Sequence, residues 1–349
     1  MSDSKLLVRS PVVKLTTLSP ESYGEVVRAA VDRGLYFDPS WHANVSATTG
    51  YTLSYLVASV SGLKVCVLPI FRRRILCFEM LGSPLAGSHT EYIGPLLLVD
   101  GLSDLEISLI AQVFFEYFTR WSIIYFNITF NNFDQTIQYL KLMAEFDRLM
   151  PSMKLHSRSG LIDVGGGLES VHQRFEGRLR TDIRKAAKSG VSIEIYRGED
   201  IGKNIESFYE VINSAFLRRN LMPRHPKSFF EGISRLEKAS PKFFLAVAEE
   251  CVVASALTIE DGTRTIYFAG GATPAGLKCS ASSLIQFKAI ASAIESGALF
   301  YDIGGFGDEG IDKFKRSLGS TEYFRTSYLY EHSVVRKLLP TYLKIRRLR

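Results

Sequence analysis

The feature that most constrains the fold of this 349-residue chain is an internal repeat. The segments "LVASVSGLKVCVLPI", from Leu56, and "LAVAEECVVASALTI", from Leu245, each predict a strand, a tight turn and a second strand, because small and β-branched residues alternate around a polar turn. A further strand, a helical segment and another strand follow each of them. Strands that alternate with helices in this way are typical of a mixed α/β sheet. The sequence therefore predicts two α/β domains built on the same plan.

The junction between the repeats is expected in the segment "LHSRSGLIDVGGGLES", residues 155–170. Its three consecutive glycines, residues 165–167, predict a flexible turn before a helix, and we interpret this turn as a connector. The predicted organisation is a flexible N-terminus (1–10), a first domain (11–160), a second domain with the main site (161–335) and a basic C-terminal tail (336–349).

Composition places the chain among globular proteins. Apolar residues make up 46% of it and charged residues 22%, and no uninterrupted apolar segment reaches the length of a membrane span. The polar start "MSDSKLLVRSP" lacks the apolar core of a secretion signal, so we expect a cytoplasmic protein. The six histidines are scattered and no Cys/His cluster is present, so no metal site is predicted.

The net charge of +6 is concentrated in two places. Residues 174–188 hold six cations against two acids, and no acid follows Glu331. Such clusters favour phosphates, RNA or an anionic membrane, or else form a solvated helix face. The tail "RKLLPTYLKIRRLR" fits either a solvated end or peripheral contact with an anionic membrane.

Two helices are predicted around the inner basic cluster. The first runs from Leu168 to Ser189, ends at Gly190, and has an apolar stripe formed by Val171, Phe175, Leu179, Ile183 and Ala187. The second covers 204–220 and ends in Arg218 and Arg219. Arg219 falls on the apolar side of that helix and Arg218 at its edge, so each of them either extends outward or awaits an anion.

A lysine near the end of the chain is the main chemical candidate. The apolar segment "ALFYDI" predicts a buried strand, and "GGFGDEGIDKFKRSLG", residues 304–319, predicts a turn and a short helix after it. On a helical wheel Lys315 lies at the rim of the apolar side, which is formed by Ile311, Phe314 and Leu318. Its neighbours Lys313 and Arg316 point to water. Ligands usually bind at this end of the strands in an α/β sheet, and a partly dry ammonium there suits a developing oxyanion. The alternative is a lysine whose stem covers apolar surface while its charge reaches solvent.

Six motifs of the second half together resemble a known family. They are "RLRTDIRKAAKSGV", "FYEVINSAFLRRN", "HPKSFFEGI", "TIYFAGGATP", "SASSLIQFKAIASAIESGALFYDIGG" and "GIDKFKRSLG". In this order they resemble the FemABX-like branch of the GNAT superfamily. The segments "PSWHAN" and "LPIFRRRILCFEMLGSP" extend the resemblance over nearly the whole chain.

The resemblance implies a fold and an activity. It implies two tandem GNAT-like domains, each a mixed sheet flanked by helices, with a cleft between them. It also implies transfer of an amino acid from aminoacyl-tRNA, or of another acyl group, to an amine. The acceptor would be an anionic precursor with a nucleotide or lipid diphosphate, such as a peptidoglycan intermediate. No tightly bound cofactor is expected, with aminoacyl-tRNA or acyl-CoA as co-substrate.

Roles for individual residues follow from the same resemblance. It implies that Lys315 lies near the reacting carbonyl with Phe314 beside it, that Arg218 or Arg219 contacts substrate phosphate, and that Tyr267 lines the site. Direct attack of an amine on an ester or thioester needs no acyl-enzyme, and no Ser/His/Asp or Cys/His set is visible. The remaining candidates are Tyr267 or Tyr301 as the acid for the leaving atom, Asp308 or Asp302 as the base, a substrate phosphate in place of that base, and Arg180 and Phe306 as substrate contacts.

Two departures from the family pattern bear on the donor. Leu318 stands where the family usually has phenylalanine, and there is no room for the coiled-coil arm of some tRNA-using members. The loop "TPAGLKCSASS", residues 273–283, lacks the central glycine of the usual coenzyme A signature. Three hypotheses remain: an aminoacyl or acyl transferase of this family, a thioester-dependent N-acyltransferase of polysaccharide or small-molecule assembly, and a non-catalytic module that binds RNA or a membrane.

Overall fold

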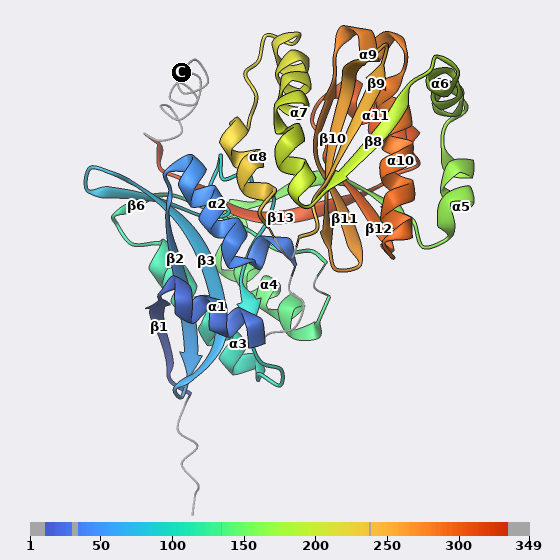
Figure 1. The fold of residues 1–349 in the computed structure, drawn as a ribbon. Helices are drawn as coiled ribbons and strands as arrows, with labels where there is room; N and C mark the ends of the chain where they lie inside the picture. The colour runs from blue at the N-terminus through green and yellow to red at the C-terminus, as the bar shows by residue number, and fades with distance from the viewer. Residues whose placement is uncertain (1–10, 30–33, 134, 237–238, 334–349) are drawn as a thin grey trace, which may run out of the picture. The chain divides into compact units, whose positions relative to one another are not determined.

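The computed structural model describes the chain in four stretches, which form two compact units (Figure 1). The described residues are 11–29, 34–133, 135–236 and 239–333. The first unit comprises residues 11–29, 51–155 and 326–333. The second comprises residues 34–50 and 156–325. This division differs from the predicted continuous domains in three segments, because residues 34–50 and 156–160 belong to the second unit and 326–333 to the first. The predicted N-terminal segment 1–10 and tail 336–349 lie outside the described residues.

The first unit is built around a mixed sheet with the strand order β1-β2-β3-β4-β6-β13, and β5 pairs with β3. Every pair in this order is antiparallel except β4 with β6, which is parallel. The strands are β1 (Val13–Leu18), β2 (Thr52–Val60), β3 (Leu63–Ile75), β4 (Phe78–Ser83), β5 (Leu96–Leu97), β6 (Ile123–Thr129) and β13 (Thr321–Glu331). The helices of this unit are α1 (Pro20–Ala29), α3 (Asp104–Phe118), α4 (Ile137–Leu149) and η2 (Pro151–Met153).

The second unit repeats this plan with the strand order β8-β9-β10-β11-β12-β7. Again every pair is antiparallel except one, β11 with β12. The strands are β7 (Lys154–Asp163), β8 (Ser192–Arg197), β9 (Lys242–Ala248), β10 (Cys251–Asp261), β11 (Arg264–Ala272) and β12 (Phe300–Gly305). The helices are η1 (Leu35–Phe37), α2 (Pro39–Thr49), α5 (Gly167–Arg174), α6 (Gly177–Lys188), α7 (Glu199–Leu217), α8 (Lys227–Ile233), α9 (Pro274–Lys278), α10 (Ala281–Glu295) and α11 (Glu309–Ser317).

The repeat predicted from the sequence is therefore confirmed, with one rearrangement. In each sheet a helix connects the two parallel strands, α3 in the first and α10 in the second. The strand that completes each sheet comes from the other repeat. β7 follows the first repeat in the chain but pairs with β12, whereas the second half of β13 follows the second repeat and pairs with β6. The two repeats have exchanged their final strands.

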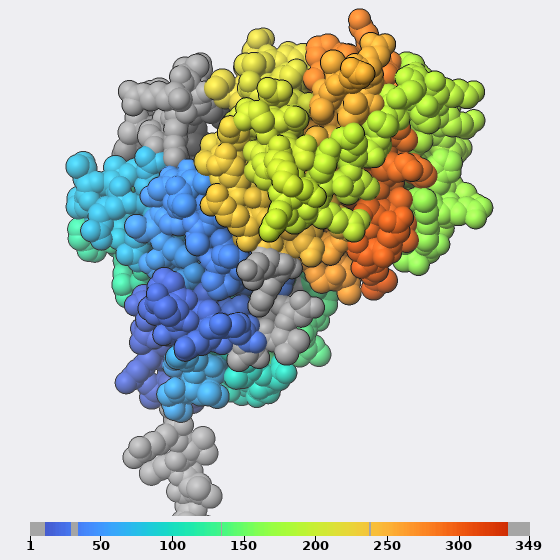
Figure 2. Space-filling view, in the orientation of Figure 1, coloured from blue at the N-terminus to red at the C-terminus, as the bar shows by residue number. Residues whose placement is uncertain are grey.

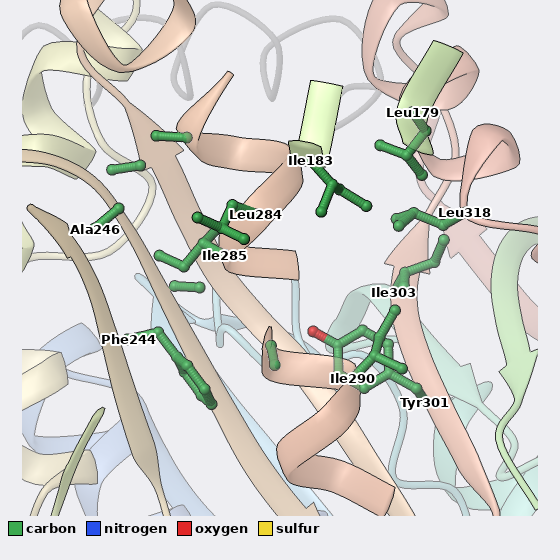
Figure 3. Close-up of a cluster of buried hydrophobic side chains, with 14 of the residues drawn as sticks. Leu179, Ile183, Phe244, Ala246, Leu284, Ile285, Ile290, Tyr301, Ile303 and Leu318 are labelled. Carbon is green, nitrogen blue, oxygen red and sulfur yellow. The ribbon is translucent and has the colours of Figure 1, made fainter. Parts of the chain in front are cut away.

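The core of the second unit fills the space between one sheet face and helices α5, α6 and α10. Figure 3 shows Leu284, Ile285 and Ile290 of α10 packed between the strands and the α6 side chains Leu179 and Ile183. α7 covers the opposite face, where a Cβ on Gly271 would meet the Ala215 side chain at 2.8 Å. The edge strand β8 is largely exposed, and Figure 2 shows its yellow-green atoms at the surface.

The predicted helix over 168–189 is wrong in one respect, because it is two helices. The chain is extended at Phe175, where α5 ends. The amide of the next residue, Glu176, donates to the Ser317 carbonyl at 2.9 Å instead of continuing the helix. Phe175 and Leu179 remain in the core on either side of the break. The predicted stripe is wrong at its end, where Ala187 is exposed and Ala186 is buried in its place. Gly190 adopts a positive φ of 73° just beyond the end of α6, as predicted.

Residues 34–50 join the second unit through aromatic and polar contacts. The Trp41 ring of α2 packs edge-on against Phe229 and Phe268, with centroids 5.7 and 5.5 Å apart. The Asn44 side chain donates to the Phe229 carbonyl at 3.0 Å, and a Cβ on Gly232 would lie 1.7 Å from its amide oxygen. Only glycine at position 232 allows α8 to approach α2 this closely.

Acid is expected to destabilise the protein through His42, a buried residue of α2 whose Nε2 contacts the Tyr36 carbonyl at 2.8 Å. Burial lowers the pKa of His42 from 6.5 to about 4. Between pH 6.5 and 4 the unfolded chain therefore binds a proton that the folded protein excludes, and stability falls by on the order of 3 kcal/mol as the pH drops through this window. Urea unfolding across this range should show a weaker pH dependence for His42→Gln. The control His156→Gln, at an exposed site, should retain the slope, and an unchanged slope in His42→Gln would contradict the expectation.

Candidate active site

The parallel strands β11 and β12 separate before they end. Among the described residues they pair only from Arg264 to Ile266 on β11 and from Phe300 to Asp302 on β12. β11 then continues to Ala272 beside β10, with Phe268 skipped in the register as a bulge. Bulges and diverging strand ends expose backbone donors and acceptors, and are common beside binding sites. The carboxyl ends of these two strands are therefore the candidate location of the active site.

The turn after β12 is fixed by two aspartates. Asp308 is the N-cap of α11, and its side chain accepts from the Ile311 amide at 3.1 Å. Asp312 accepts from the Gly307 amide at 3.0 Å and the Asp308 amide at 3.3 Å. Burial alone would raise the pKa of Asp312, but these hydrogen bonds outweigh it and the pKa is lowered. The turn is thus closed around an ionised carboxylate.

Lys315 presents its ammonium at the end of β12. The residue is only 9% exposed, and its Nζ donates to the Gly305 carbonyl at 2.6 Å. Nζ also lies 5.6 Å from the centre of the Phe306 ring. The prediction that Lys315 alone of the three cations faces the packed side is confirmed, since Lys313 and Arg316 are exposed.

The apolar side of α11 is narrower than predicted. Phe314 packs against the core and Leu318 lies in it, but Ile311 is 41% exposed. The reason is the cap, which places Ile311 in the first turn beside Asp308, where the helix meets solvent. Phe306 remains next to the lysine and also carries the Arg316 guanidinium, 5.1 Å from its centre.

The two arginines after α7 have different partners. Arg218 donates to the Ala272 carbonyl at 2.7 Å, at the end of β11. Arg219 forms an ion pair with Asp308. The Arg219 side chain is 41% exposed and that of Asp308 42%. The structure therefore brings Arg219 to the start of the helix that carries Lys315, whereas Arg218 is tied to the neighbouring strand.

The two candidate tyrosines lie in or against the same core, and one of them is bonded to a buried glutamine. Tyr301 is fully buried among the apolar side chains shown in Figure 3, and its hydroxyl donates to Gln286 Oε1 at 2.9 Å. Tyr267 is less deeply buried and packs against the same core. Burial raises the pKa of Tyr267 to about 12 and that of Tyr301 well above its ordinary value. Of the two tyrosines, Tyr267 is the more exposed residue, whereas Tyr301 lies inside the core.

Arg180 is bonded to the backbone near the end of α5. Its Nη1 donates to the carbonyls of Phe175 and Gln173, at 2.6 and 3.0 Å. These carbonyls lie at the break between α5 and α6. The guanidinium thus closes the end of α5, and these two bonds do not join it to Lys315 or Arg219.

Asp302, a candidate base, is part of a buried ionic network instead. It is 1% exposed, and its Oδ2 accepts from the Tyr323 hydroxyl at 2.9 Å and lies 3.5 Å from Arg264 and 3.6 Å from Arg325. Its Oδ1 accepts from the Gly304 amide at 2.8 Å. A carboxylate held by these partners anchors the end of β12.

Three of these residues were not singled out from the sequence: Gln286, Asp312 and Arg325. Gln286 had a detectable signal, because it is a polar residue of the largely apolar helical segment predicted over 282–298. The signal at Asp312 was weaker: an acidic residue four positions after the cap of α11. Arg325 had no signal, since its counter-ion Asp302 is distant in the chain.

The loop that would receive a pyrophosphate is internally bonded. Its segment α9 opens at Thr273, whose side chain accepts from the Gly276 amide at 3.2 Å. The amides of Leu277, Cys279 and Ser280 donate to carbonyls within the same loop. A Cβ on Gly276 would lie 2.1 Å from the Val253 carbonyl, so this glycine is required by packing on β10.

Among the described residues no cluster of His, Cys, Asp or Glu is arranged to hold a metal ion. Nor is any described helix long and apolar enough to cross a bilayer.

Comparison with known proteins identifies this architecture. The family described as Acetyltransferase (GNAT) domain, whose members are acyltransferases, matches residues 173–316. The structure of FemX is similar at a TM-score of 0.66 and 13% identity, over 93% of this chain and 99% of that one. The C-terminal domain of a putative lysylphosphatidylglycerol synthetase from Agrobacterium fabrum has a TM-score of 0.56 and 12% identity, over 93% and 95%.

A tandem GNAT protein from the clavulanic acid biosynthesis pathway has a TM-score of 0.54 and 10% identity, over 91% of this chain and 98% of that one. No curated protein matches the chain by sequence. At these identities the likeness shows the fold, and the predicted tandem GNAT-like architecture is confirmed.

Proposed function

We propose that this chain, whose residues 173–316 form a GNAT domain, is an N-acyltransferase that forms an amide by moving an aminoacyl group from aminoacyl-tRNA, or another acyl group, to an amine of a phosphate-bearing precursor. The observation that carries the proposal is the buried ammonium of Lys315, held at the Gly305 carbonyl where β11 and β12 no longer pair. A cation held in a dry, fixed position stabilises a developing oxyanion without reorganisation during the reaction.

This geometry supports a direct transfer without an acyl-enzyme. An acceptor amine attacks the donor carbonyl, and the negative charge of the tetrahedral intermediate falls on an oxygen near Lys315. The intermediate then collapses, and the Tyr267 hydroxyl protonates the departing oxygen or sulfur while the nitrogen loses a proton. Phe306 lies beside the lysine ammonium, and Phe314 packs the same helix against the core. Asp308, engaged by Ile311 and Arg219, contributes by fixing these two groups.

Aminoacyl-tRNA is the first candidate donor because the loop over 273–283 uses its own amides. Four of them bond within the loop, which leaves a poor cradle for the pyrophosphate of coenzyme A. The resemblance to the FemABX-like branch also favours an aminoacyl donor, a cytoplasmic site of action and a diphosphate-bearing acceptor such as a peptidoglycan intermediate. A thioester donor is the second candidate, and the acetyltransferase family match over residues 173–316 favours it.

One experiment separates these donors. Purified protein is incubated with a pool of radiolabelled aminoacyl-tRNA or with acetyl-coenzyme A, in each case with a nucleotide-diphosphate-linked peptidoglycan peptide that has a free amine. We expect a labelled amide product whose formation ribonuclease abolishes. Release of free coenzyme A would select the thioester reaction instead. No consumption of either donor, together with tight RNA binding, would refute transfer and favour the non-catalytic hypothesis.

Arg219→Ala is expected to raise KM for the diphosphate-bearing acceptor by roughly 10- to 100-fold with little change in kcat, because a charge-assisted hydrogen bond contributes about 1.5–3 kcal/mol. Stability should change by less than about 1 kcal/mol, since the pair with Asp308 is exposed. Steady-state kinetics with varied acceptor tests this. Arg224→Ala removes an exposed arginine of the following segment and should leave KM unchanged. Equal effects of the two substitutions would assign the change to overall charge.

A further inference from the structure

We infer that two neighbouring turns of the first unit dock on the surface of an anionic lipid bilayer. One is the β3–β4 hairpin turn with its flanking residues, 72–79, and the other precedes β6, residues 119–122; we call them the paired turns. The Glu79 amide donates to the Ser122 carbonyl at 2.8 Å and so holds the two turns together. In Figure 1 the hairpin turn is the light-blue tip at the end of β3. The inference goes beyond the proposed function and does not depend on it.

The first observation is the exposure of large apolar side chains at the paired turns. Leu76 is 88% exposed, Trp121 80% and Ile75 42%. The Trp121 ring packs edge-on against Phe78, with centroids 6.5 Å apart, and Phe78 pairs with Ile75 across the hairpin. Single apolar residues scattered over a surface are ordinary, but a contiguous group of them usually marks an interaction site. The paired turns carry such a group.

The second observation is the composition of the hairpin turn. Leu76 and Cys77 join the paired residues Ile75 and Phe78, and Leu76 has a φ of 55°. Two-residue hairpin turns normally contain Asn, Asp or Gly, because other side chains are strained in the left-handed region. Leu76 therefore strains the backbone, and its exposed side chain gains almost no burial in return. A partner that buries this side chain would give it a use.

The third observation is the charge around the apolar group. The paired turns contain one acid, Glu79, and four arginines: Arg72, Arg73, Arg74 and Arg120. Glu79 forms ion pairs with Arg72 and Arg74, at 3.4 and 3.3 Å, yet the Arg74 side chain remains 70% exposed. Arg120, next to the exposed tryptophan, is itself exposed. The apolar group is therefore surrounded by net positive charge.

An anionic bilayer surface fits both properties of the paired turns. Tryptophan is favoured at the boundary between lipid headgroups and acyl chains, apolar side chains enter the boundary beside it, and arginines are attracted to anionic headgroups. Two projecting turns can enter a lipid layer without a complementary pocket. An RNA backbone would attract the arginines but would leave Ile75 and Leu76 in water. The bilayer is therefore the partner that uses the whole surface.

Intrinsic fluorescence tests the inference with the unmodified protein. The chain has two tryptophans, of which Trp41 is fully buried and Trp121 exposed, so a change in emission on binding reports Trp121. Vesicles that mix phosphatidylglycerol with phosphatidylcholine should shift the emission to shorter wavelength, and brominated acyl chains should quench it. Trp121→Phe should remove both effects. No shift and no quenching with the mixed vesicles would overturn the inference.

Two other partners are separated by the same measurement. A shift that RNA produces and mixed vesicles do not would assign the paired turns to a nucleic acid. A shift that appears without vesicles when the protein concentration is raised, together with a larger mass in light scattering, would assign them to a second copy of this chain. Either result overturns the inference.

Leu76→Asn separates docking from folding. Co-sedimentation with the mixed vesicles should show an affinity reduced roughly tenfold or more, because a leucine no longer leaves water on binding. Urea unfolding should show equal or greater stability, because asparagine accepts a positive φ more readily. The matched control Leu63→Asn changes a leucine that is 61% exposed at the other end of β3, and it should leave the affinity unchanged. Equal affinities of Leu76→Asn and the unmodified protein would contradict docking through the paired turns.

Discussion

Lys315→Ala is expected to lower kcat by on the order of 100- to 1,000-fold while the protein remains folded, which is the usual effect of removing one preorganised oxyanion donor. The structural loss is small, because one hydrogen bond to the Gly305 carbonyl disappears and the cation–π contact with Phe306 goes with it. Single-turnover measurements with saturating donor and acceptor should assign the loss to the chemical step. KM should change little, since the lysine acts on charge that develops only during the reaction.

The matched control is Lys313→Ala, which removes an exposed cation of the same helix and the same formal charge. It should retain nearly full activity. Lys315→Arg adds a second comparison, because a planar guanidinium keeps the charge but cannot occupy the position of a compact ammonium. A stable Lys315→Ala protein with normal kcat would end the assignment of this residue to catalysis.

Asp302→Asn is expected to reduce the free energy of unfolding by about 3–5 kcal/mol, because it leaves the buried cations Arg264 and Arg325 without one of their counter-charges. The substitution preserves size, so the effect reports charge. Activity should also fall, since the same carboxylate holds the Gly304 amide and thereby the carbonyl to which Lys315 is bound. Urea unfolding followed by circular dichroism measures the first effect.

Asp200→Asn is the control for this change. It neutralises an exposed aspartate paired with Lys203 at the start of α7, where an ion pair contributes at most about 1 kcal/mol. If Asp302→Asn and Asp200→Asn lower the free energy of unfolding equally, the Asp302 network does not behave as a buried ion cluster. Asp302 would then not be an anchor for β12.

The sequence predicted the features that depend on local pattern. The repeat of strand, turn and strand near Leu56 and Leu245 needs only alternation and turn chemistry, and the structure has it in both units. The packed position of Lys315 needs only the geometry of a helix. The division of 168–189 into α5 and α6 was not predictable in the same way, because the break is stabilised by the Ser317 carbonyl, far along the chain.

Two of the remaining misses depend on distant residues. No local pattern reveals that Asp302 meets Arg325 or that residues 34–50 join the second unit. The bond from Arg180 to the Phe175 carbonyl is local, but it closes a helix end that the sequence did not predict. The candidate site was found from the sequence at the level of its helix and its lysine. Its supporting residues, Gln286 and Asp312, carry a signal in the sequence, but what each of them holds became clear only with their partners in place.

The exchanged strands have a consequence for synthesis on the ribosome. The sheet of the first unit is completed by the second half of β13, near the end of the described chain, whereas the sheet of the second receives β7 before its other strands have been made. The N-terminal repeat therefore keeps an uncompleted sheet edge until the strands of the second repeat and β13 have emerged. A fragment that stops at residue 320 would lack β13, the strand that pairs with β6. We therefore expect that neither repeat can be separated from the other by cutting the gene between them.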